Sequence, residues 1–322
     1  MDLPILYLVI PCYNEAKVLP QTHPLFLNKI RNLIQAAKIS PLSQIMYVDD
    51  GSKDKTWDLI EGFSMENHHT QGISQSRNRG HQNAIFAGMM EARKQADIVI
   101  TIDCDGQDDI NCIDQMVAAY QNGSDIVYGV RSNRKSDTWF KRSSAQLFYK
   151  LMAFLGADTI YNHADYRLLS KRVLNELSNY KEVNLYLRGL IPLIGFNYSV
   201  VEYERYERME GESHYPLSKM LTLAFDGITS LSIKPIRLVT LMGAFATLLS
   251  LLLIIWVFYG YWTDNTVAGW ASTYIVVCFM GGIQLLSIGV IGEYIGKIYL
   301  EVKARPKYII AKRTQKEEIE KH

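Results

Sequence analysis

Short apolar runs alternate with longer amphipathic segments over the first two hundred residues. The runs are rich in β-branched residues, whereas the segments between them carry apolar positions at helical spacing. The expected strands are Leu3–Ile10, Gln44–Val48, Gly72–Gln75, Ile98–Ile102 and Asp125–Val130. The expected helices are Leu25–Ala37, Lys55–Ser64, Gln82–Lys94 and Ile113–Gln121. This alternation predicts an α/β, Rossmann-like domain with a mostly parallel sheet and ligands at the carboxyl ends of its strands.

Two long apolar stretches follow Pro235. They cover about residues 238–262 and 270–294, and each exceeds the roughly 20 helical residues that cross a hydrocarbon core. Buried core helices are the alternative, but both stretches lack charge until their ends and are bounded by aromatic residues. We therefore predict a two-helix transmembrane hairpin within residues 235–300.

Basic residues flank the predicted hairpin. Lys234 and Arg237 precede it and a basic tail, residues 301–322, follows it, while the connector holds Asp264 and no Lys or Arg. The bias of basic residues toward the cytoplasm predicts a multi-pass cell-membrane protein whose α/β domain and both termini are cytoplasmic. The apolar run near the N-terminus is too short for a signal peptide and lacks a basic leader.

Two further segments have the pattern of amphipathic helices. One covers about residues 139–155, and the other covers residues 216–234, directly before the first predicted span. Such helices pack either on a sheet or on a membrane surface. We favour the bilayer surface for the second and leave both possibilities open for the first. The α/β domain then occupies residues 1–215, and residues 216–234 form a juxtamembrane helix.

Charge and cysteine usage narrow the classes of function. The 34 Lys and Arg residues nearly balance the 33 Asp and Glu residues, which argues against nucleic-acid binding. Four cysteines occur, none of them in a Cys-x-x-Cys pair, and no His cluster accompanies them. We therefore expect neither a zinc site nor a disulfide framework.

The loop after the fourth expected strand carries four carboxylates, on Asp103, Asp105, Asp108 and Asp109. Carboxylates at alternate positions can converge on Mg²⁺ or Mn²⁺, which bind substrate phosphates as well. A solvated acidic loop that caps the next helix is the alternative, and it suits Asp108 and Asp109. For Asp103 and Asp105 we favour contact with a metal or substrate, because other motifs point the same way.

Three further polar motifs follow expected strand ends. In Pro11–Glu15, Tyr13 offers a face on which a base can stack. Asp49–Thr56 begins with two adjacent acids that can accept hydrogen bonds from a base or a ribose, and its later residues suit a helix cap. Ser76–His81 carries two arginines that can bind phosphate, and we assign no role to His81.

Together these motifs resemble the family 2 glycosyltransferases, whose catalytic domain has the GT-A fold. The matching residues are Pro11-x-Tyr13-Asn14-Glu15, Asp49-Asp50-Gly51-Ser52-x-Asp54-x-Thr56, Arg77-Asn78-x-Gly80 and Asp103-x-Asp105-x-Gln107-Asp108. The resemblance implies a nucleotide-sugar bound by Pro11, Tyr13, Asn14, Glu15, Asp50, Ser52, Arg79, Asp103 and Asp105. It also implies Mg²⁺ or Mn²⁺ on Asp103, Asp105 and Gln107, with Asp105 in a catalytic role.

The second half of the chain narrows the resemblance. Its motifs are Gly129-Val130-Arg131, Asp165-Tyr166-Arg167-Leu168-Leu169-Ser170 and Arg208-x-x-Gly211-Glu212-Ser213-His214-Tyr215, followed by the hairpin. This order is similar to the polyprenyl-phosphate glycosyltransferases, the group of bactoprenol glucosyltransferases and, more distantly, dolichyl-phosphate mannose synthase. His214 stands where that group usually has Lys, and Asp109 where it commonly has Pro. The resemblance also suggests a homotetramer.

The resemblance implies inverting transfer of a hexose from a nucleotide-sugar to polyprenyl phosphate for cell-envelope glycans. We rank UDP-glucose ahead of UDP-N-acetylglucosamine as the donor. The expected ligands of the acceptor phosphate are Arg131, Arg142, Arg208 and Ser213, with a surface salt bridge an equal alternative for each arginine. Asp165 matches the position often proposed as the catalytic base. A phosphate monoester, with a second pKa of about 6, needs no base, so we expect Asp165 to align the acceptor or support the metal site.

Two other functions compete with this one. A processive polysaccharide synthase shares the first motifs, but the Gln-x-x-Arg-Trp signature of those enzymes is absent from the sequence. A non-catalytic membrane scaffold would keep the fold without the chemistry. The intact acids Asp103, Asp105 and Asp165 argue against a scaffold.

Overall fold

The computed structural model describes residues 3–131, 163–183, 185–204, 206, 232, 234–262 and 269–314. The chain divides into two compact units, of which one holds the sheet and the other holds two long helices. The amphipathic helix predicted near residues 139–155 lies outside the described residues, as does most of the one predicted at residues 216–234.

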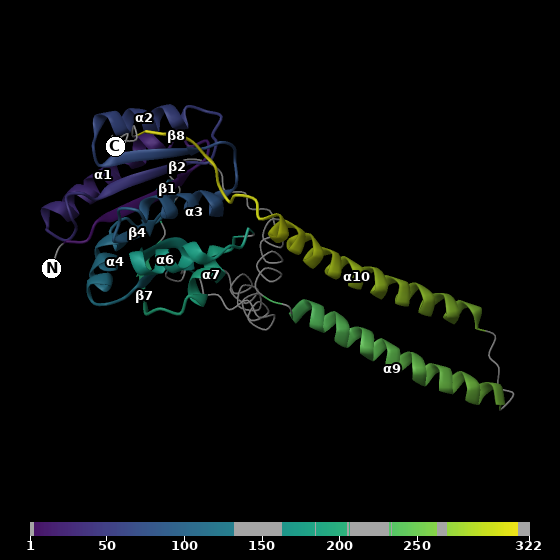
Figure 1. The fold of residues 1–322 in the computed structure, drawn as a ribbon. Coiled ribbons are helices and arrows are strands. Elements are labelled where there is room, and N and C mark those ends of the chain that lie inside the picture. The colour runs from purple at the N-terminus through teal and green to yellow at the C-terminus, as the bar shows by residue number, and fades with distance from the viewer. Residues whose placement is uncertain are drawn as a thin grey trace. The chain divides into compact units, whose positions relative to one another are not determined.

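The sheet unit has eight strands (Figure 1). They are β1 (Leu6–Cys12), β2 (Gln44–Asp49), β3 (Thr70–Gln75), β4 (Ile98–Thr101), β5 (Ile126–Arg131), β6 (His163–Ser170), β7 (Tyr198–Tyr203) and β8 (Ile310–Arg313). The helices of this unit are α1 (Leu19–Gln35), α2 (Thr56–Glu66), α3 (His81–Ala92), α4 (Cys112–Gln121), α6 (Lys171–Asn179) and α7 (Leu187–Leu193).

The strand order is β7-β5-β6-β4-β1-β2-β3-β8. Strands β4, β1, β2 and β3 are parallel neighbours, and β5 is parallel to β7. Strand β6 runs antiparallel to both β4 and β5, and β8 runs antiparallel to β3. The predicted mostly parallel α/β sheet is therefore confirmed in its central part, within a sheet that is mixed as a whole.

Alternation along β1 divides the core between the two faces of the sheet. Leu6, Leu8 and Ile10 pack with buried residues of α1, α2 and α4. Tyr7 and Val9 pack on the other face with buried residues of α3, α6 and α7. The sheet is thus covered by helices on both faces, which leaves the carboxyl ends of its central strands as the place for polar loops.

The five predicted strands correspond to β1–β5, with ends that agree or differ by up to three residues. Helix α1 begins at Leu19, six residues before the predicted start, because a proline is tolerated in the first helical turn. The pattern missed β6, α6, α7, β7 and β8. In β6 the polar residues Asp165 and Arg167 occupy buried positions. The strand therefore lacks the alternation of apolar and polar residues by which strands are predicted.

The end of the described chain returns to the sheet. Strand β8 pairs with β3 and is the last strand on that side of the sheet. Next to it, the Ser76 N–H donates to the Ile309 carbonyl at 2.9 Å. Farther along, the Gly72 N–H donates to Thr314 Oγ1 at 2.8 Å. Part of the predicted basic tail is therefore a structural strand that covers the edge of the sheet.

The second unit contains α9 (Lys234–Trp262) and α10 (Trp270–Lys303), which contact each other. Both predicted spans fall within these helices, and α10 continues nine residues beyond the predicted end at Tyr294. Among the described residues, one helical segment, Phe279–Lys303, is long and apolar enough to cross a membrane.

Candidate functional site

The acidic loop leaves the carboxyl end of β4. The side chain of Asp103 is 34 % exposed, whereas Asp105 and Gln107 are buried. Gly106, at a φ of +70°, turns the backbone so that the Gln107 N–H donates to Asp105 Oδ1 at 3.1 Å. The loop therefore holds two carboxylates and an amide, all predicted metal ligands, in one turn of chain.

The donor set in this loop fits a hard divalent cation. Burial, against the opposing effect of His81 and together with the negative charges of Asp108, Asp165 and Asp105, raises the pKa of Asp103 to about 6. This surplus of negative charge is what a divalent cation neutralises. No cluster of three or more His, Cys, Asp or Glu residues arranged for a metal occurs in the described ranges. Magnesium or manganese would then take its other ligands from water and substrate phosphate.

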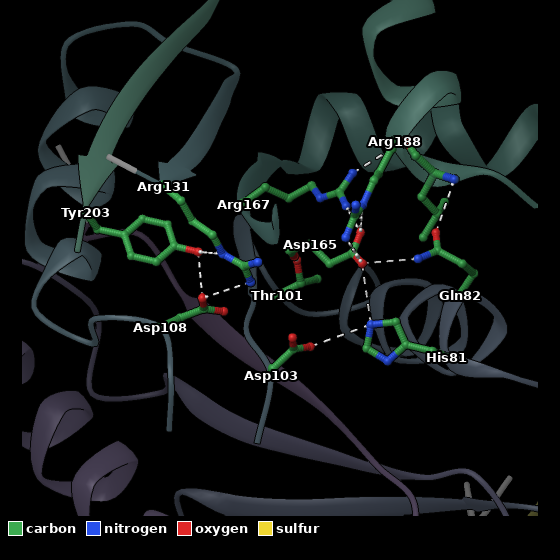
Figure 2. Close-up of polar contacts among 11 residues, drawn as sticks. His81, Gln82, Thr101, Asp103, Asp108, Arg131, Asp165, Arg167, Arg188 and Tyr203 are labelled. Atoms are coloured by element: carbon green, nitrogen blue, oxygen red, sulfur yellow. Dashed lines mark hydrogen bonds and ion pairs between the residues drawn. The ribbon is translucent and has the colours of Figure 1, made fainter. Parts of the chain in front are cut away.

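The two remaining acids of the loop have different roles. Asp109 Oδ1 accepts the Asn111 N–H at 2.9 Å in the turn before α4, but the N-cap residue is Asn111 and no side chain caps this helix, so the predicted capping role is not seen. Asp108 instead accepts a hydrogen bond from the Tyr203 hydroxyl at 2.6 Å and pairs with Arg131 at 3.4 Å (Figure 2). The guanidinium of Arg131, at the end of β5, is thus held by Asp108 of the loop and Tyr203 of β7. The other predicted ligands of the acceptor phosphate, Arg142, Arg208 and Ser213, lie outside the described residues.

The predicted donor-binding loops after β1 and β2 are fastened together. Asn14, at a φ of +55°, donates its N–H to Ser52 Oγ at 2.9 Å, and its Oδ1 accepts the Lys53 N–H at 2.9 Å. The Glu15 N–H donates to Thr56 Oγ1 at 2.9 Å. Pro11 is buried in β1. Tyr13 stays 43 % exposed, so its ring is available for stacking on a base.

Asp50 fastens the loop that follows β3. Its two carboxylate oxygens accept the Arg79 N–H at 2.8 Å and the Gly80 N–H at 2.9 Å. Neighbouring Asp49 accepts the Ser74 hydroxyl at 2.6 Å. Three loops at the carboxyl ends of β1, β2 and β3 are therefore cross-linked by the residues that the motifs singled out. Within the described part of the chain, the buried Arg79 Nε has no hydrogen-bond partner.

Replacing Gly51 with alanine should lower the free energy of unfolding by about 2 kcal/mol or more. Gly51 has a φ of +69°, and a Cβ there would lie 2.6 Å from the Arg77 carbonyl carbon. The strain would also move the fastened loops, so donor binding should weaken. Chemical denaturation and calorimetric titration with the nucleotide measure the two effects. Gly62→Ala is the control, since nothing lies within 4 Å of its Cβ position. Equal stability of the two variants would contradict the prediction.

Asp165 on β6 is the most heavily bonded acid of the site. Its carboxylate is buried and accepts hydrogen bonds from Arg167 and from Gln82 Nε2, the latter at 3.3 Å. Arg188 donates from Nε at 3.2 Å and from Nη2 at 3.0 Å (Figure 2). The Thr101 hydroxyl, at the end of β4, donates to the backbone carbonyl of Asp165. These contacts join β6 to α3, α7 and the start of the acidic loop.

His81, the first residue of α3, connects Asp165 to the acidic loop. Its Nε2 lies 3.5 Å from Asp165 Oδ2 and 3.5 Å from Asp103 Oδ1. From the sequence, His81 was assigned no role, and Gln82 and Arg188 belong to none of the motifs. Only the alternation of Asp165 and Arg167 was visible in the sequence, since residues two apart in a strand share a face.

The surroundings of Asp165 keep it ionised. Burial alone would raise its pKa, but the hydrogen bond from His81 and the positive charges of Arg188 and Arg167 hold the pKa well below the usual range of an aspartate. A carboxylate with so low a pKa is a weak base near neutral pH.

Comparison with known proteins gives two family matches. Residues 7–178 match Glycosyl transferase family 2, and residues 234–298 match the GtrB C-terminal hairpin. The uncharacterized glycosyltransferase YkoT of Bacillus subtilis is 49 % identical over 307 residues, which cover 95 % of this chain and 91 % of that protein. The SfII prophage-derived bactoprenol glucosyl transferase of Shigella flexneri is 38 % identical over 314 residues, covering 95 % and 97 %. A crystal structure of glucosyl-3-phosphoglycerate synthase from Mycobacterium tuberculosis aligns with a TM-score of 0.46 at 16 % identity, covering 71 % and 79 %.

Proposed function

Since this chain belongs to glycosyl transferase family 2, in the group of the bactoprenol glucosyl transferases, we propose that it transfers glucose from UDP-glucose to a polyprenyl phosphate. The proposal rests on the closeness of the acidic loop after β4 to the buried Asp165, since His81 contacts both. The Asp103–Gln107 loop offers oxygen ligands for a metal-bound diphosphate, and Asp165 beside it is held by two arginines. UDP-N-acetylglucosamine is the second candidate donor.

The donor would lie over the fastened loops at the carboxyl ends of β1, β2 and β3. Tyr13 offers its exposed ring to the base, and Asp50 keeps the loop of Arg79 in place. Asp103, Asp105 and Gln107 would hold Mg²⁺ or Mn²⁺, which supplies Lewis-acid stabilisation of the leaving diphosphate when bound.

The reaction is a single displacement that inverts the anomeric carbon. A phosphate oxygen of the lipid forms the new bond as the bond to the nucleoside diphosphate breaks. The acceptor is already largely a dianion near neutral pH, so no residue has to remove a proton from it. The low pKa of Asp165 supports a role in holding neighbouring groups instead of a role as a base.

The match to the GtrB hairpin supports a lipid acceptor. That match spans α9 and nearly all of α10. The sheet unit includes chain on both sides of the hairpin, up to Tyr215 before it and from Ala304 after it. A hairpin that crosses the membrane twice, with both ends in the cytoplasm, agrees with this connectivity and with the basic flanks. The homotetramer stays a prediction.

We expect the purified protein to move label from UDP-glucose into a lipid-extractable product when polyprenyl phosphate and manganese are present. The assay uses a panel of radiolabelled donors that includes UDP-N-acetylglucosamine and GDP-mannose. Label transferred from another donor only would correct the sugar and keep the reaction class. The absence of a lipid-linked product from every donor would contradict the proposal.

A further inference from the structure

Arg188 lies beside Asp165, on the first turn of α7, and belongs to none of the motifs. It meets the carboxylate side-on, with Nε 3.2 Å from Oδ1 and Nη2 3.0 Å from Oδ2. Its side chain is 40 % exposed. Within the described part of the chain, its Nη1 has no hydrogen-bond partner. Arg188 therefore has a guanidinium that Asp165 fixes in place and that still reaches solvent.

The charges around Asp165 do not cancel within this group. Arg167 is fully buried and donates to the same carboxylate and to the Leu187 carbonyl at 3.4 Å. A buried guanidinium needs a carboxylate of its own, because an unpaired buried charge is strongly unfavourable. Two arginines thus share one Asp165 carboxylate. Of the two, Arg188 is the partner that reaches solvent.

We propose that Arg188 binds a phosphate oxygen of a substrate and that Asp165 is the positioning residue that orients its guanidinium. The inference rests on the proposed function, in which both substrates carry phosphate, as a monoester in the acceptor and a diphosphate in the donor. Arginine matches phosphate oxygens with a planar pair of donors. A guanidinium that is already held by a carboxylate loses little conformational freedom when it binds a ligand.

The position of Arg188 supports this role. His81 links the same Asp165 carboxylate to Asp103, so three successive contacts connect Arg188 to the predicted metal ligand (Figure 2). Arg131, a predicted ligand of the acceptor phosphate, is bonded to Asp108 and Tyr203. The side chain of Arg188 is the more exposed of the two, at 40 % against 28 % for Arg131.

Arg188→Gln should raise the KM for one phosphate substrate by about tenfold or more, because it removes a charge-assisted hydrogen bond. The KM for polyprenyl phosphate is measured at saturating donor and the KM for the nucleotide-sugar at saturating acceptor, so the value that changes identifies the substrate. Arg188→Lys should show a smaller rise. Arg172→Gln is the control, since Arg172 on α6 is 67 % exposed and pairs with Asp125, which contacts none of the described residues of the site. Unchanged KM values in Arg188→Gln would overturn the inference.

A double variant separates phosphate binding from simple neutralisation of Asp165. If Arg188 only balances the carboxylate, Asp165→Asn combined with Arg188→Gln should recover the parental KM. If Arg188 binds phosphate, the KM of the double variant should stay as high as that of Arg188→Gln. Thermal unfolding of each variant identifies any that fails to fold, and Arg188→Lys then provides the comparison. Recovery in the double variant would overturn the inference.

A binding experiment tests Arg188 independently of turnover. Inorganic phosphate and pyrophosphate are titrated into the full chain and followed by ³¹P resonance broadening. Binding to the parent should weaken by about tenfold in Arg188→Gln and stay unchanged in Arg172→Gln. Equal binding by parent and Arg188→Gln, or no binding by the parent, would overturn the inference. Absence of lipid-linked product with this binding difference intact would instead contradict only the proposed function.

Discussion

Asp105→Ala should lower the rate of sugar transfer by at least about a thousandfold while the protein stays folded. A metal that stabilises the leaving diphosphate contributes several kcal/mol to the transition state, and each 1.4 kcal/mol is about tenfold in rate. Asp105 accepts the Gln107 N–H within its own loop and lies outside the main apolar clusters. Its loss should therefore affect metal and donor binding far more than stability.

Turnover at rising manganese concentration and calorimetric titration with UDP measure this effect. Asp109→Ala is the matched control, because Asp109 lies in the same loop and bonds the Asn111 N–H before α4. It should cost about 1 kcal/mol of stability as a lost hydrogen bond and leave manganese dependence unchanged. Turnover of Asp105→Ala within tenfold of the parent would remove Asp105 from the metal site.

Asp165→Asn should lower the free energy of unfolding by about 3 kcal/mol or more. The change keeps the shape of the side chain but removes the charge that balances Arg167 and Arg188. Arg167 is fully buried, so its charge would be left without compensation. Chemical denaturation measures the loss. Asp125→Asn is the control, since Asp125 pairs with a largely exposed arginine at 3.6 Å and its change should cost under about 1 kcal/mol.

The same variant has a defined dependence on pH. The pKa of Asp165 falls on folding, so the carboxylate adds stability above its unfolded pKa of about 3.9 and loses that contribution as the pH falls through the folded value. The stability difference between parent and Asp165→Asn should therefore be constant from about pH 6 to 8 and shrink in acid. The pH–rate profiles of the parent and of Asp165→Asn should have the same shape near neutral pH. A change of rate with pH that is present in the parent and absent from Asp165→Asn would indicate that Asp165 acts as a base.

The strand-end motifs were predictable because each follows an apolar run that reads clearly as a strand. The family resemblance drawn from them, the GT-A fold and the glycosyltransferase activity are confirmed by the match to Glycosyl transferase family 2. The contacts around Asp165 were not predictable in the same way. Arg188 and His81 reach it from helices separated by about one hundred residues, and neither has a local pattern that distinguishes it from a surface residue.

Strand β8 was unpredictable for a different reason. Its four residues include Lys312 and Arg313, which read as part of a basic tail. Pairing with β3 supplies the hydrogen bonds that the local sequence cannot, and Arg313 also pairs with Glu91 on α3. A short, charged strand of this kind is defined by its partner, so only the folded chain reveals it.

The pairing of β8 with β3 also sets an order of events during synthesis. Gly72 and Thr314 are bonded across 242 positions of chain, and α9 and α10 are made between them. A ribosome therefore completes both long helices before the sheet receives its last strand. A nascent chain that stops short of β8 keeps the edge of β3 open to pairing with other chains. The eight-stranded sheet is therefore complete only after the whole hairpin has been translated.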